Sequence, residues 1–281
     1  MIMFALLASH ETAFCAARPA APEEAGETKR TAPAAASESK EYAPSGEEKE
    51  MMQKISETSD EKELDKYLVE AAQEGFLHAL KMLLDDKKVN PDVIIDLFEM
   101  SALVNATNHG HVNCVQALLD ADANVNLVVS GATALIEGSM SGNIECVRAL
   151  LNAGADINFQ DSAGNTPVYL AAESGNPECL RELISRKANL SIPNDRKQSP
   201  LRAAAIGSST GVHRRGCRAC VQLLIEAGVE TDMGKGTPKL AQAVVDRCVR
   251  ENRKRLAAKG SHPNFPSMAI IEEEEPIANE E

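Results

Sequence analysis

Apolar residues in the middle of the chain fall into short stripes at helical spacing, and residues 161–184 show this pattern most completely. Thr166 can cap a first helix with its hydroxyl, and Pro167 can occupy the first helical position, where its missing N–H costs nothing. Gly175 can adopt the left-handed conformation that ends a helix. The apolar positions of the two helices are Leu170, Ala171 and Ala172, then Leu180, Leu183 and Ile184. One such unit cannot bury its own apolar side, so we expect copies around it.

Copies of the unit do lie on both sides. The glycine that ends the first helix recurs at Gly110, Gly142 and Gly175, which are 32 and 33 positions apart. A fixed period of this length, with paired helices and a polar turn, indicates a repeat architecture. A degenerate first copy covers residues 62–84, and the others cover 101–126, 133–158, 166–191, and 199–205 continued by 216–232.

The chain before the repeats has a different composition. Ala, Pro, Glu, Ser and Lys dominate from Arg18 to Thr58, and such a segment buries too little apolar area to offset its ordering entropy. The first eight residues are apolar but have no basic flank, so a presequence is the alternative at this end. Residues 58–61 match the capping-box pattern that starts a helix. We therefore assign 1–58 to a disordered or presequence-like segment, 59–232 to the repeat array, 233–258 to a C-terminal capping helix and 259–281 to a disordered acidic tail.

Two connections in the array are unusual. Residues 90–101 are long and apolar, and the sequence leaves open whether they pack across the first interface or begin as a short helix. In the fifth copy, residues 206–215 are inserted between the two helices. We expect this insertion to bulge as a loop.

Several motifs recur together in these copies. They are Thr166-Pro167, Ser199-Pro200-Leu201, Gly110-His111, Leu118-Leu119, Leu150-Leu151 and the GADIN run at 154–158. In these motifs the units resemble ankyrin repeats over roughly residues 66–232. The resemblance implies an all-α solenoid of four to five stacked helix–turn–helix units with projecting hairpin turns. The histidine of the family's TPLH motif is absent, so its usual hydrogen bonds to neighbouring turns must be replaced or missing. Its positions hold Val104, Ile136, Tyr169 and Arg202.

Net charge and cysteine content limit which functions and compartments the sequence supports. The formal net charge is −13, and the six Glu of residues 261–281 leave −7 for the rest of the chain, which disfavours nucleic-acid binding. No apolar run has the length of a membrane span. Four cysteines share one register and are expected to be buried free thiols, which favours a reducing compartment: Cys114, Cys146, Cys179 and Cys220. We expect a cytoplasmic protein, with the nucleus as the alternative.

The sequence offers no chemistry that would predict an enzyme. It contains no nucleophile-elbow serine, phosphate-binding glycine loop or H-E-x-x-H helix, and we expect no cofactor. Cys217-x-x-Cys220 with His213 is too sparse for a zinc site, because a second cysteine pair is absent, and we expect no metal. The basic run from Arg247 to Arg255 is either the solvent-exposed side of the last helix or a binding patch. Such a patch would act in nuclear import or would bind an acidic partner.

The candidate site follows from the resemblance, because hairpin tips and exposed first-helix positions of ankyrin arrays form a concave partner-binding groove. Leu127 to Val129 either form an exposed apolar contact patch or pack on the neighbouring hairpin. The candidate partner-binding residues are Leu127, Val128, Val129, Met140, Phe159, Gln160, Ser162, Asn165, Glu173, Arg196, Lys197 and Gln198.

The expected function is therefore a non-catalytic protein–protein interaction, through the groove, by a chain that is monomeric on its own. One alternative is a regulatory or scaffolding subunit of an enzyme complex whose chemistry lies in another chain. Another is that residues 272–275 fold back on the basic last helix, or on the Arg214-Arg215 loop, as an internal competitor. The sequence does not identify the partner.

Overall fold

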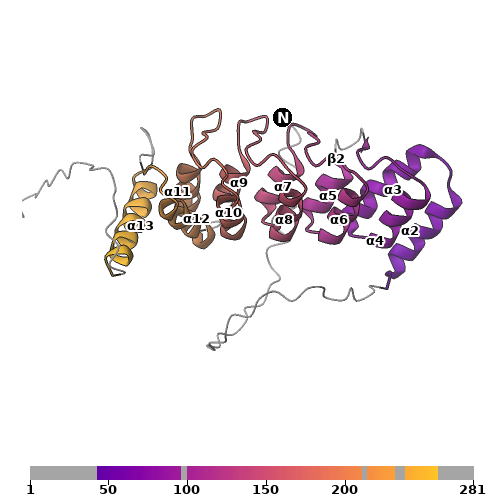
Figure 1. Cartoon of the computed structure of the whole chain (residues 1–281), viewed down its shortest axis with the longest axis horizontal. Coiled ribbons are helices and arrows are strands. Elements are labelled where there is room, and N and C mark those ends of the chain that lie inside the picture. The colour runs from indigo at the N-terminus through magenta and orange to yellow at the C-terminus, as the bar shows by residue number, and fades with distance from the viewer. Residues whose placement is uncertain (1–42, 96–99, 211–213, 232–237, 259–281) are drawn as a thin grey trace, which may run out of the picture. The chain divides into compact units, whose positions relative to one another are not determined.

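Paired helices follow one another along the chain in the computed structural model, which describes residues 43–95, 100–210, 214–231 and 238–258. From Pro44 onward the pairs stack in a row, with first helices beside first helices and second helices beside second helices (Figure 1). The first helices are α3 (Glu61–Glu74), α5 (Ala102–Asn108), α7 (Ala134–Ser141), α9 (Pro167–Glu173) and α11 (Pro200–Thr210). The second helices are α4 (Leu77–Lys81) with the π-helical turn η1 (Met82–Asp86), α6 (Val112–Asp120), α8 (Ile144–Asn152), α10 (Pro177–Ser185) and α12 (Arg214–Glu226).

The predicted start and stop signals are confirmed in the best-preserved copy. The Thr166 hydroxyl accepts a 3.1 Å hydrogen bond from the Tyr169 N–H, and Pro167 is the first residue of α9. The predicted helix-ending glycines have left-handed backbones, with φ of +78° at Gly110, +82° at Gly142 and +72° at Gly175. The sequence pattern therefore fixes both ends of these first helices correctly.

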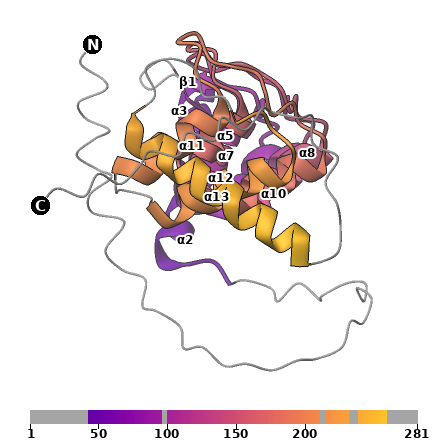
Figure 2. The same cartoon turned by 90° about the vertical axis from the view of Figure 1, so that its left-hand side faces the viewer.

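The core runs through the stack as one apolar cluster. It includes fully buried leucines of the second helices, such as Leu118, Leu150 and Leu183, and it reaches both ends of the array. The hairpin connections between copies all project from one side of the stack (Figure 2). We call this surface, made of residues 121–133, 153–166 and 186–199 together with the exposed side of the first helices, the hairpin face.

The prediction that the chain is disordered up to Thr58 is wrong for residues 46–57. These residues form helix α2 (Gly46–Glu57), which buries Met51 and Ile55 against α3 and α4. Two apolar residues four positions apart are enough to stabilise this helix, because they pack on an apolar surface that the first copy already presents. Thr58 ends α2, and Asp60 rather than Thr58 caps α3 by accepting from the Lys62 N–H at 3.1 Å. The rest of the predicted disordered segment, residues 1–42, lies outside the described residues.

The unusual connection before the second copy forms a short antiparallel ladder. Strand β1 (Ile94–Ile95) pairs with β2 (Met100–Ser101), with Ile94 opposite Ser101 and Ile95 opposite Met100. Val93 and Ile95 pack against the core, while Ile94 is 42% exposed. Of the two readings left open, packing across the first interface agrees with these contacts.

The predicted loop in the fifth copy is largely helical instead. Helix α11 continues to Thr210 and α12 begins at Arg214, so the insertion lengthens both helices. Ser208 is buried, and its hydroxyl donates to the Ala205 carbonyl at 2.8 Å, which satisfies the polar group within the helix. The loop was predicted because an insertion between two paired helices usually bulges outward, but these residues extend the helices instead.

Helix α13 (Lys239–Ala258) closes the far end by packing on α11 and α12. Ala241, Val245 and Cys248 are buried in this contact, which confirms the predicted closing helix. Its basic side chains are exposed, namely Arg247, Arg250, Arg253, Lys254 and Arg255. Residues 259–281, predicted to be an acidic tail, lie outside the described part of the chain. None of the described helices is both long and apolar enough to span a bilayer.

Candidate functional site: the hairpin face

Hydrogen bonds between copies hold the hairpins in register. The Asn126 carboxamide oxygen accepts from the Asp156 N–H at 2.8 Å, and the Asn158 oxygen accepts from the Asn189 N–H at 2.9 Å. Asp92 does the same one step earlier, accepting from the Asn124 N–H at 2.8 Å. Because each bond joins one hairpin to the next, the tips are held at fixed positions relative to one another.

A second ladder of hydrogen bonds joins the helix turns. The Asn143 amide donates to the Thr107 and Asn108 carbonyls, both at 2.8 Å. Asn176 repeats this one copy later, donating to the carbonyls of Ser139 at 3.0 Å and Met140 at 2.8 Å, and His111 occupies the same place with Nε2 at 2.9 Å from the Gln73 carbonyl. These side chains satisfy carbonyls that the ends of the first helices leave without an intrahelical partner.

An apolar cluster occupies the position of the missing motif histidine. Ile136 and Tyr169 stand where that histidine would be, and they pack with Leu170 and Ala203 on the hairpin side of the array. Phe159 packs against the cluster from the preceding hairpin, and the Tyr169 hydroxyl donates to the Gln198 side-chain oxygen at 3.1 Å in the following one. Apolar packing and the hydrogen bond of Tyr169 therefore replace some of the contacts to neighbouring turns that the histidine would make.

Glu173 lies close to Tyr169 of this cluster, and Asp161 lies close enough to act on both Glu173 and Glu137. Partial desolvation raises the pKa of Glu137, and the nearby Asp161 charge raises it further. Desolvation also raises the pKa of Glu173, while its hydrogen bond with Tyr169 and the positive charge of Arg196 act in the opposite direction. Burial, and then the charge of Glu173, raise the pKa of the Tyr169 phenol to about 12, so this hydroxyl stays protonated and able to donate.

Comparisons with known proteins agree with this architecture. The family model for ankyrin repeats (3 copies) matches residues 68–161 and 153–235, which is more than half of the chain. The chain belongs to the ankyrin repeat family. Among solved structures, the ankyrin repeat domain of human ASB11 superposes with a TM-score of 0.54 at 32% sequence identity, covering 65% of this chain and 82% of that chain. A search of curated proteins gave no match.

The three apolar residues predicted at the first ankyrin hairpin do not form a continuous exposed patch. Val129 is only 6% exposed and pairs through its backbone with Ala132, and Leu127 packs half-buried against the core. Val128 alone, at 46% exposed, faces solvent. Ser130 and Gly131 both have positive φ, and this tight reversal turns two of the three side chains inward.

The remaining predicted site residues lie on the hairpin face of the ankyrin array, but they differ in accessibility. Phe159, Asn165 and Gln198 are half-buried, and Asn165 accepts from the Asn194 amide at 3.1 Å in the next hairpin. These three residues therefore make contacts within the array, between neighbouring copies. The exposed members are Met140, Gln160, Ser162, Glu173, Arg196 and Lys197.

Two site residues were missing from the sequence-based set. Glu137 belongs to α7 and Asp161 to the following hairpin, and their proximity appears only once the copies are stacked. Glu137 takes the register of Leu170 and Ala203, a position that is apolar in those copies. The same position in the second copy is Asn105, so a carboxylate at a register that varies between polar and apolar residues was only a weak signal.

The cysteines are core residues. Burial raises the pKa of Cys114, Cys179 and Cys220 to about 12 and that of Cys146 to about 11, so these thiols remain protonated at neutral pH. Cys217 donates to the Glu173 carbonyl at 3.4 Å, and His213 lies outside the described residues. Within the described residues there is no group of three or more His, Cys, Asp or Glu arranged to hold a metal ion.

Proposed function

We propose that this protein is a non-catalytic binding module that holds a partner protein on its hairpin face. Ankyrin repeats generally mediate protein–protein interactions and are typically non-catalytic. One observation supports the placement of the partner. The exposed large apolar side chains among the described residues are Ile94, Val128, Met140 and Leu240, and two of them, Val128 and Met140, lie on the hairpin face. Exposed apolar groups that recur on one surface are typical of a contact surface.

The mechanism is rigid presentation. The asparagine ladders fix the hairpins and helix turns before a partner arrives, so little chain entropy is lost on binding. Met140 supplies an apolar contact. Glu173, at the same register one copy later, and Arg196, whose charge acts on Glu173, supply opposite charges that select a partner by complementarity. Each of these three side chains is exposed, so each is available to a partner.

Affinity capture with the full chain tests this surface. Met140→Glu should reduce capture of the partner, because a charge would enter an apolar contact. Leu240→Glu makes the same change at a side chain that is 59% exposed at the start of α13, outside the residues of the hairpin face, and should leave capture unchanged. Equal capture by wild type and Met140→Glu, or equal loss in both variants, would place the partner elsewhere. A captured protein with catalytic activity would make this chain a regulatory or scaffolding subunit.

We also propose a reducing compartment such as the cytoplasm for this protein, and a monomeric state on its own. Six buried cysteines in the described residues carry free thiols, and an oxidising compartment would select against such a set.

A further inference from the structure

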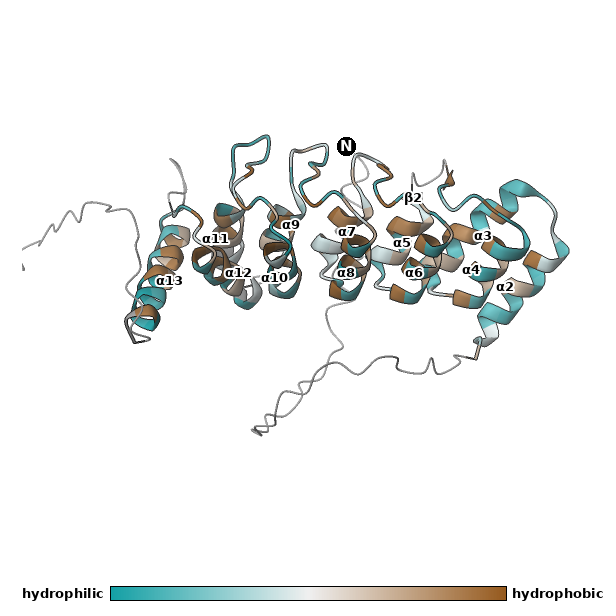
Figure 3. Ribbon diagram, viewed as in Figure 1, coloured by the Kyte–Doolittle hydropathy of each residue, from teal (hydrophilic) through white to brown (hydrophobic). Residues whose placement is uncertain are grey.

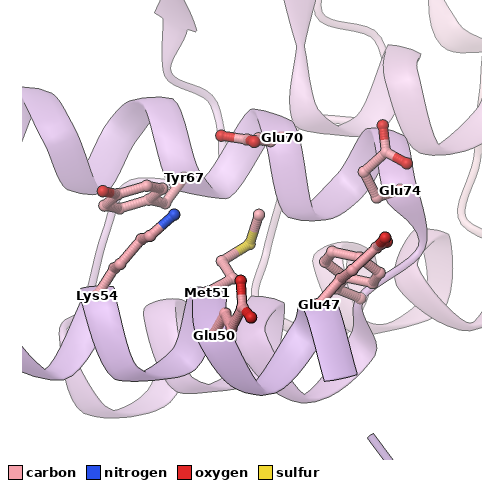
Figure 4. Close-up of a pocket in the computed structure, with 8 residues that line it drawn as sticks. Glu47, Glu50, Met51, Lys54, Tyr67, Glu70 and Glu74 are labelled. Atoms are coloured by element: carbon pink, nitrogen blue, oxygen red, sulfur yellow. The ribbon is translucent and has the colours of Figure 1, made fainter. Parts of the chain in front are cut away.

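A second candidate contact lies at the N-terminal end of the array, away from the middle copies. Helices α2 and α3 line a half-open pocket of about 250 Å³ (Figure 4). Its lining residues are Glu47, Glu50, Met51, Lys54, Tyr67, Glu70, Glu74 and Phe76. Four come from α2, three from α3 and Phe76 from the turn before α4, so the pocket exists only because α2 is folded onto the first copy.

Three of the eight lining residues are apolar or aromatic, although the pocket surface as a whole is more polar than apolar. Met51 is 7% exposed, and Tyr67 and Phe76 are half-buried. In Figure 4, Met51 points from α2 into the space between the two helices, and Lys54 extends toward the Tyr67 ring. Aromatic rings and a thioether are favourable neighbours for the stem and the charged end of a long cationic side chain.

The rim of the pocket carries an excess of negative charge. Glu47, Glu50, Glu70 and Glu74 are all exposed, and none of them forms an ion pair with another residue in the described part of the chain. Lys54 is the one basic residue among the lining residues. Four carboxylates against one ammonium group leave a surface that attracts a cation.

The size of the pocket limits what it can hold. Sites for drug-sized ligands and cofactors have volumes of roughly 300–1,000 Å³, so this pocket suits a smaller group. Lysine and arginine bury an aliphatic stem along apolar surface and keep the charged end at a polar rim. We propose that this pocket binds a lysine or arginine side chain from a basic segment of a partner protein. The proposal is tested independently of the proposed partner contact on the hairpin face, because Met140, Glu173 and Arg196 belong to later copies and none of them lines the pocket.

A peptide titration of the full chain tests the pocket. The probe is acetyl-Gly-Ser-Lys-Arg-Ser-Gly-amide, and its matched control carries norleucine and citrulline in place of Lys and Arg. In ¹⁵N-resolved spectra at low salt, the basic peptide should shift the amides of Tyr67 and Phe76 saturably, and the neutral peptide should not. Equal shifts from both peptides, or no shift at these amides, would overturn the proposal.

Variants separate the pocket from general attraction to an acidic chain. Glu70→Gln with Glu74→Gln should weaken the basic peptide about three- to tenfold, as expected for the loss of two exposed ion pairs. Glu61→Gln with Glu178→Gln removes the same charge outside the pocket and should leave the affinity unchanged. Lys54→Gln should tighten binding, because it removes the competing cation. An equal loss of affinity in both double variants would assign the binding to net charge alone. The Met140→Glu variant should bind the basic peptide as tightly as wild type, which keeps this result separate from the hairpin face.

Discussion

The side-chain amide of Asn143 donates to the main-chain carbonyl of Thr107 at 2.8 Å, joining residues 36 positions apart in the chain. The same amide also reaches the Asn108 carbonyl, so one side chain serves two carbonyls at the end of α5. Because Asn176 repeats this arrangement, the contact is part of how successive copies are joined.

We expect Asn143→Ala to lower the free energy of unfolding by about 1–3 kcal/mol, because it removes two hydrogen bonds at a part-buried contact between copies. Asn113→Ala is the matched control, since Asn113 is exposed on α6 and should change stability little. Urea denaturation of the two variants measures the difference. Equal midpoints would mean that water replaces the Asn143 contact at no cost.

Glu48 should anchor helix α2. Its carboxylate is fully buried and accepts from the His78 N–H at 2.7 Å and the Ala79 N–H at 3.4 Å, at the start of α4. Glu48→Ala should therefore cost about 1–3 kcal/mol and increase amide hydrogen exchange throughout α2. The exposed neighbour Lys49 provides the control substitution to Ala. Unchanged exchange in α2 after Glu48→Ala would show that Met51 and Ile55 hold the helix without it.

Glu137 should make the protein less stable as the pH rises. Its pKa in the folded state is raised above the ordinary carboxyl value, so the folded state binds more protons than the unfolded state, and stability falls as the pH increases through that range. Glu137→Gln should therefore raise the melting temperature at pH 7, and its advantage should disappear below the ordinary carboxyl pKa. Glu230→Gln, at an exposed loop position, should show no such trend. A lower melting temperature for Glu137→Gln at pH 7 would contradict this account.

Gly216 should tolerate no side chain. A Cβ at this position of α12 would collide with the backbone carbonyl of Gly175, in the turn after α9. Gly216→Ala should lower the free energy of unfolding by about 1–3 kcal/mol, because backbone must move to make room. At Gly46 a Cβ would meet no atom within 4 Å, so Gly46→Ala should be neutral or slightly stabilising. Calorimetric melting of both variants distinguishes a steric effect from the general effect of replacing glycine.

Much of the fold could be predicted from local sequence signals. Thr166, Pro167 and Gly175 define the ends of one helix by chemistry within a single turn, and the period repeats that chemistry. Helix α2 escaped prediction because its buried apolar residues, Met51 and Ile55, are stabilised by the first copy rather than by their own segment. When a helix is stabilised mainly by tertiary contacts, the apolar pattern of its own sequence is too weak to predict it.

The candidate site was less predictable. Exposure at a hairpin depends on backbone reversal, and the positive φ of Ser130 and Gly131 turns Val129 inward although its sequence neighbour Val128 remains exposed. The inter-copy asparagine contacts were also missed, because Asn143 and Asn176 resemble ordinary turn residues until the preceding helix end is placed beside them.

Helices α2 and α13 occupy opposite ends of the stack (Figure 1), and hydrophilic residues predominate along α2 (Figure 3). A row of similar units with bare ends would offer an apolar surface on which a further molecule could continue the row. Here α2 turns Lys49, Gln53 and Glu57 outward at one end, and α13 exposes its arginines at the other. Both described ends of the array therefore present polar and charged side chains where a bare repeat would present an apolar surface.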